Sequence, residues 1–73
     1  MTDMELEASV RAYCRRRPFK PFIVEFFSGV QVVVDHPEGI GPLDGLWLYR
    51  GPNRAQSLFP STSVCRLLDA AAG

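Results

Sequence analysis

His36-Pro37-Glu38 is the segment of this chain whose residue types come nearest to acid–base chemistry. An imidazole titrates near neutral pH, so His36 could serve as a base or a ligand with Glu38 as its partner. The sequence has only this one histidine, and no local motif marks a nucleophile. A reaction needs an assembled set of groups. We therefore expect a structural role, with His36 bonded to loop backbone and Pro37 directing the chain, and we predict no enzyme, metal site or cofactor.

A second candidate is a concentration of positive charge near the N-terminal end of the chain. Its members are Arg11, Arg15, Arg16, Arg17 and Lys20. Such a cluster, with the aromatic Phe19 inside it, could bind the phosphates of a nucleic acid. The formal net charge of the chain is zero, however, and Glu5 and Glu7 lie close in sequence. Cations also stabilise the C-terminal end of a helix, so a solvated helix end is the alternative interpretation.

Length and composition limit the remaining possibilities. Seventy-three residues allow one domain, 1–73, and the 47% hydrophobic content is typical of a globular protein. Two cysteines, Cys14 and Cys65, cannot form a disulfide framework, and we expect both to be reduced thiols buried in the core. The acidic start lacks the basic and apolar regions of a signal peptide, and no apolar run approaches the roughly 20 residues of a membrane span. We expect a cytoplasmic protein without a membrane partner.

The elements that would carry these residues begin with a helix over 2–17. Thr2 and Glu5 have the spacing of a capping box, and Pro18 ends the helical pattern. Apolar side chains recur at helical spacing and define one buried stripe. They are Leu6, Val10, Tyr13 and Cys14.

Two strands, 22–27 and 30–36, are expected to form a β-hairpin, because both are rich in β-branched and aromatic residues. A two-residue loop would place polar Gln31 opposite Phe26. A three-residue loop over 27–29, with Gly29 in the left-handed region, instead brings the apolar residues to one face. The predicted cross-strand pairs are Phe26 with Val30, Val24 with Val32, and Phe22 with Val34.

The second half of the sequence is less regular. Residues 37–45 are rich in glycine and proline and are expected to form a loop. Strands are predicted at 46–50 and 55–59. Residues 64–68 fit either a closing strand or a short helix that begins after Ser63.

Three motifs occur in order along the chain: Arg16-Arg17-Pro18-Phe19-Lys20-Pro21-Phe22, the hairpin glycine Gly29, and His36-Pro37-Glu38. This pattern resembles a family of short uncharacterised bacterial proteins, closely over residues 5–40 and loosely over 41–69. Ser28 stands where that family usually has Asp. The resemblance implies a final strand pair, which favours a strand at 64–68, and it implies no activity.

The order of elements is also similar to SH3-like and Sm-like small barrels, although the Sm nucleotide-binding motifs are not recognisable. We therefore expect an α+β fold, an N-terminal helix followed by a strongly bent antiparallel sheet of four to five strands.

The expected sheet is apolar on both faces, and one helix covers only one of them. The second face would present Ile23, Phe27, Val33, Trp47 and Tyr49, unless Trp47 points into the core. Exposed apolar patches mark interfaces. We therefore predict a non-catalytic interaction module with a protein partner or a second copy. A homodimer would form through this face or an unpaired strand edge, and the alternative function is nucleic-acid binding by the basic cluster.

Overall fold

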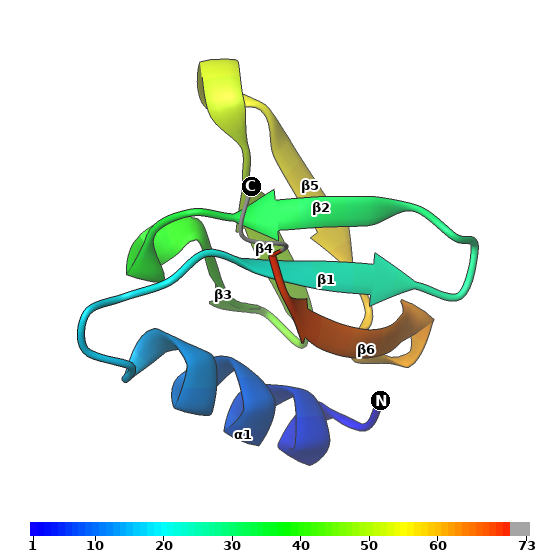
Figure 1. Ribbon diagram of the computed structural model, residues 1–73. Helices are drawn as coiled ribbons and strands as arrows, with labels where there is room; N and C mark the ends of the chain where they lie inside the picture. The colour runs from blue at the N-terminus through cyan, green and yellow to red at the C-terminus, as the bar shows by residue number, and fades with distance from the viewer. Residues whose placement is uncertain (71–73) are drawn as a thin grey trace.

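The computed structural model describes residues 1–70 and shows an α+β fold of one helix and two antiparallel sheets of three strands each (Figure 1). One sheet, sheet A, has the strand order β2-β1-β6, and the other, sheet B, has the order β3-β4-β5. The elements are α1 (Asp3–Cys14), β1 (Phe22–Phe26), β2 (Gln31–Val34), β3 (Ile40–Leu43), β4 (Leu46–Arg50), β5 (Gln56–Phe59) and β6 (Val64–Asp69), with 3₁₀ turns η1 (Pro37–Gly39), η2 (Pro52–Arg54) and η3 (Ser61–Ser63).

Helix α1 begins with the predicted capping box. The Thr2 hydroxyl accepts a hydrogen bond from the Glu5 amide at 3.1 Å, and the Glu5 carboxylate accepts one from the Thr2 amide at 2.8 Å. The helix ends at Cys14 and not at residue 17, and Arg15 is its C-cap. The residue before Pro18 avoids helical geometry, so the chain must leave the helix ahead of it. Arg17 donates to the Cys14 carbonyl at 3.2 Å, which satisfies one of the free carbonyls at the helix end.

Sheet A confirms the predicted hairpin register. Phe22 lies opposite Val34 and Val24 opposite Val32, and the Phe26 amide donates to the Val30 carbonyl. Gly29 has φ +91°, the left-handed value that the three-residue loop requires. Strand β2 is shorter than the predicted 30–36, because the chain turns away after Val34 towards η1.

The last segment of the chain is a strand. Strand β6 pairs with β1 on the side away from β2, so the strand alternative for 64–68 is confirmed. A β-bulge interrupts this pairing, since Val64 faces Phe26 while Arg66 faces Glu25, which leaves Cys65 as the extra residue.

Sheet B contains a strand where a loop was expected. Residues 40–43 form β3, which pairs with β4 through a two-residue turn at Asp44 and Gly45. Both turn residues have positive φ, +50° and +80°, as a type I′ hairpin turn requires. Asp-Gly between two leucines was a hairpin signal in the sequence, and the prolines at 37 and 42 obscured it.

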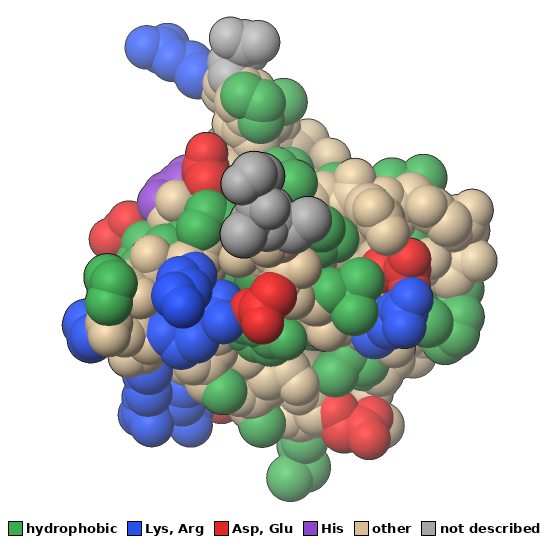
Figure 2. Space-filling model, in the orientation of Figure 1, with side chains coloured by type: hydrophobic (Ala, Val, Ile, Leu, Met, Phe, Trp, Pro, Cys, Tyr) green, Lys and Arg blue, Asp and Glu red, His purple; other side chains and the backbone are tan. Residues whose placement is uncertain are grey.

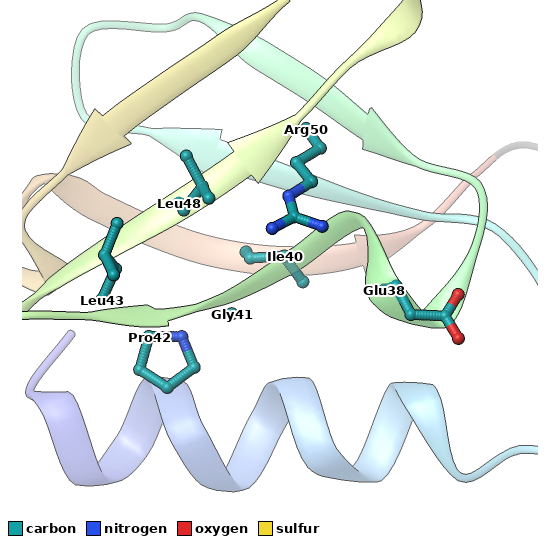
Figure 3. Close-up of a pocket in the computed structure, with 7 residues that line it drawn as sticks. All are labelled: Glu38, Ile40, Gly41, Pro42, Leu43, Leu48 and Arg50. Carbon is teal, nitrogen blue, oxygen red and sulfur yellow. The ribbon is translucent and has the colours of Figure 1, made fainter. Parts of the chain in front are cut away.

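The core lies between the two sheets, and α1 runs beside β6 and β3 to cover one side of it (Figures 1 and 3). Every helix and strand contributes to it. Its buried apolar members are Leu6, Val10, Phe22, Val24, Val34, Ile40, Trp47, Tyr49, Phe59 and Val64. Over residues 1–70 the strands form two separate hydrogen-bonded sheets and no closed barrel, so the single, strongly bent sheet of the sequence analysis is not confirmed.

Candidate interaction surfaces

The basic cluster is built from the end of α1 and the segment that joins it to β1. Arg11 pairs with Glu7 one helical turn earlier, with 2.6 Å between Nη2 and Oε1. Arg16 pairs with the Asp69 carboxylate on β6, donates to the Lys20 carbonyl at 3.1 Å, and stacks 4.6 Å above the Tyr13 ring. Two of the predicted site residues are therefore engaged in holding the fold together.

The other members of the cluster are at the surface, although Arg17 also donates to the Cys14 carbonyl at the end of α1. Arg15, Arg17 and Lys20 are exposed, and none forms an ion pair with a carboxylate within residues 1–70. Figure 2 shows Lys and Arg side chains gathered on the left of this face, over the end of α1 and the segment after it. The structure thus brings the predicted basic residues together, but their free charge is smaller than the sequence implied.

His36 does not assemble a catalytic group with Glu38. Its Nδ1 lies 2.7 Å from Asp35 Oδ1, and this contact lowers the pKa of the Asp35 carboxyl. The expected bond from His36 to loop backbone is replaced by this bond to its neighbour's side chain. Within residues 1–70, no group of three or more His, Cys, Asp or Glu side chains is placed to hold a metal ion.

The two thiols occupy different environments, and only one is near the core. Cys14, the last residue of α1, is half-buried, its Sγ lies 3.7 Å from the Pro37 carbonyl, and burial together with nearby Glu38 raises the pKa of the thiol. Cys65 is exposed at the bulge of β6. The prediction of a buried Cys65 was wrong, because the extra residue of a bulge is displaced from the strand's inward and outward alternation.

The outer face of sheet A contains three of the predicted interface residues, but a polar row divides them. Glu25 accepts from Gln31 Nε2 at 2.8 Å and from Arg66 Nε at 2.6 Å, so hydrogen-bonded side chains cross all three strands. Ile23 and Val33 are cross-strand partners on one side of this row, and Phe27, which is 71% exposed, lies beyond its other side. These side chains therefore do not form one continuous apolar patch.

Trp47 and Tyr49, the remaining predicted interface residues, belong to the core. Trp47 is 4% exposed and Tyr49 is 9% exposed. The Tyr49 hydroxyl donates to the Val33 carbonyl at 2.7 Å, a bond that reaches from sheet B to sheet A. The expectation of an outward face is corrected here, because β4 is the central strand of sheet B and turns its two large aromatic side chains towards α1 and sheet A.

The alternation of β4 therefore places its leucines on the outer face of sheet B, where no site was predicted from the sequence. Leu48 lies opposite Gly41 on β3 and opposite Leu58 on β5, so these residues form a row across the sheet. Leu43 and Leu46, opposite each other beside the turn, extend the apolar area. In Figure 3, Leu43 and Leu48 lie along a cavity of ≈ 170 Å³ that Glu38 and Arg50 also line.

Comparison of the chain with protein-family models, with curated proteins and with solved structures found no match. The surfaces of the molecule must therefore be interpreted from their own chemistry. In the part of the chain that the structure describes, no helix is long and apolar enough to cross a membrane.

Proposed function

We propose that this protein is a non-catalytic interaction module that binds another protein surface or a second copy of itself. The observation that carries the proposal is the leucine-rich outer face of sheet B, where Leu58 is 56% exposed and Leu43 and Leu48 line a solvent-open cavity. An antiparallel sheet that faces only water normally alternates apolar and polar residues, with the polar ones outside. A face that places leucines outside is typical of an interface.

We also propose that the two sheets are an open relative of the SH3-like and Sm-like small barrels. In support, the chain runs from an N-terminal helix through the strands to a short 3₁₀ turn, and a final strand then returns to pair with β1. Such small folds present binding sites on their surfaces, and their function must be argued from those sites. The two unpaired thiols support a reducing compartment, and we place the protein in the cytoplasm.

The test compares the wild-type protein with a variant whose outer faces are both polar, Leu58→Glu combined with Val33→Glu. Both side chains are exposed, so the fold should tolerate the changes. We expect the wild type to self-associate in sedimentation velocity, or to retain a protein in affinity capture that the variant does not retain. A wild type that stays monomeric and captures the same proteins as the variant would contradict the proposal.

Nucleic-acid binding is the second candidate, and the observation that favours it is the group of exposed cations, Arg15, Arg17 and Lys20. Phosphate binding by three cations predicts an affinity that falls steeply with salt. Reversal to Arg15→Glu and Arg17→Glu should abolish binding to single-stranded RNA or DNA in a low-salt titration. Arg50→Glu, which also reverses a positive charge but does so on sheet B, outside the basic cluster, is the control. No binding to either polymer at low salt would exclude this function.

A further inference from the structure

The row Gly41–Leu48–Leu58 on sheet B contains a recess at one end and a projection at the other. Gly41 has no side chain, and a Cβ built there would meet no atom within 4 Å, so the space above β3 is open. This space is part of the ≈ 170 Å³ cavity, which is open to solvent and is lined by apolar residues together with Glu38 and Arg50. Leu58, at the other end of the row, is 56% exposed. Leu48 lies midway between them.

Such a row is complementary to itself under two-fold rotation. A two-fold axis can lie between two such faces and run along β4. Rotation about it places β5 of the second copy over β3 of the first, and β3 of the second copy over β5 of the first. Because a symmetric dimer uses the same patch on both subunits, the patch must hold both the projecting and the receiving group. On the basis of the proposed interaction function, we propose that the outer face of sheet B binds a second copy of this chain, with Leu58 of each copy in the recess above Gly41 of the other.

The charges at the rim of the face are compatible with a second copy. Glu38 and Arg50 lie at the same end of the cavity and carry opposite signs (Figure 3), and they form no ion pair with each other. A two-fold axis along β4 places the two Arg50 side chains beside each other, because Arg50 lies on β4, with a Glu38 carboxylate on either side, so the four charges sum to zero. The formal net charge of the whole chain is zero, so two copies experience no overall repulsion.

At sheet B, contact between faces is favoured over pairing of strand edges. Sheet B has two edge strands, and Pro42 lies within β3 while Pro60 directly follows β5. Proline has no N–H to offer to an added strand, and prolines at edges oppose edge-to-edge pairing. The outer face of sheet A is a poorer alternative, because the hydrogen-bonded row Gln31–Glu25–Arg66 crosses it. Such a satisfied polar row gains little from being covered.

The face of sheet B is small, since its three strands have only four or five residues each. A stable protein interface buries about 800 Å² on each partner. We therefore expect a reversible dimer whose population rises with protein concentration, and not a permanent one.

Sedimentation equilibrium over a range of concentrations tests the proposal. We expect the wild type to shift from the mass of one chain to the mass of two. Leu58→Glu should raise the dissociation constant about tenfold or more, because it removes a buried leucine and places a charge in the recess. Gly41→Val fills the recess without strain, since Gly41 has an ordinary φ and free space around it, and it should weaken the dimer similarly.

Val30→Glu is the matched control. Val30 has the same 56% exposed fraction as Leu58 but lies at the end of the β1–β2 hairpin on sheet A. The Val30→Glu variant should therefore dimerise with the dissociation constant of the wild type. Circular dichroism and thermal unfolding confirm that each variant is folded. A wild type that stays monomeric overturns the proposal, as does a dimer that tolerates Leu58→Glu and Gly41→Val or that is weakened equally by Val30→Glu. In each of these cases affinity capture still tests the interaction function by itself.

Discussion

Backbone positions in the left-handed region determine two of the hairpins of this protein. Gly29 closes the β1–β2 hairpin with φ +91°, and Asp44 and Gly45 close the β3–β4 hairpin with φ +50° and +80°. Glycine adopts such values without the steric cost that a Cβ imposes, and Asp is among the few other residues that tolerate them. Because these turns set the cross-strand register, single residues decide which side chains reach the core and which reach the outer faces.

Gly29→Val tests this role. No atom lies within 4 Å of a Cβ at Gly29, so the cost arises from backbone strain and not from a clash. We expect a loss of about 1–2 kcal/mol in the free energy of unfolding, measured by denaturant titration. Gly41→Ala, at an ordinary φ with equal free space, should cost little. Equal losses for the two variants would show that strain is not the cause.

Hydrogen-bonded side chains tie the three strands of sheet A together on its outer face. Glu25 on the central strand β1 accepts from Gln31 on β2 and from Arg66 on β6. These two partners hold the pKa of the Glu25 carboxyl below its ordinary value near 4.5, with the Gln31 bond the larger cause. The row thus supplies a polar surface and cross-strand contacts at the same time.

The lowered pKa of Glu25 predicts a pH dependence of stability. A carboxyl whose pKa is lower in the folded than in the unfolded state stabilises the fold above the unfolded pKa. That stability is lost as the pH falls from about 4.5 through the folded value. Glu25→Gln should therefore lower the melting temperature at pH 7 and lose less stability than the wild type on acidification. Parallel melting-temperature profiles for the two proteins would contradict this prediction.

The whole molecule depends on contacts between its two sheets. Tyr49 in the middle of sheet B donates to the Val33 carbonyl on β2, and burial together with nearby Asp35 raises the pKa of the tyrosine hydroxyl. Phe26 and Phe59 meet edge to face, with ring centroids 4.9 Å apart, and add a second link between the sheets. Arg16 and Asp69 connect the segment after α1 to the last strand. A chain this short thus relies on contacts between residues far apart in sequence.

Tyr49→Phe removes the hydroxyl link and keeps the ring. We expect a loss of about 1 kcal/mol in unfolding free energy, because the Val33 carbonyl loses its donor. Tyr13→Phe is the control, since its hydroxyl reaches the Leu67 carbonyl only at 3.5 Å and should contribute less. A Tyr49→Phe variant as stable as the wild type would show that solvent replaces the bond without cost.

Local sequence was sufficient for the features that depend on neighbouring residues. The capping box at Thr2 and Glu5 and the β1–β2 register with left-handed Gly29 were predicted, and the structure confirms them. Strand β3 was missed although Asp44-Gly45 marked its turn. These features involve few residues along the chain, so propensity and turn chemistry are enough to determine them.

Tertiary structure decided which side chains are buried and which lie on the surface. Alternation along β4 separates Trp47 and Tyr49 from Leu46 and Leu48, but it does not say which set is buried. The answer depends on what packs against β4, and the aromatic pair fills the space between the sheets and α1. The same long-range packing pairs Arg16 with Asp69, 53 residues away, and reduces the free charge of the basic cluster. Sequence alone thus determined the local turns and pairings, while only the assembled core determined that leucines, and not aromatics, face outward from sheet B.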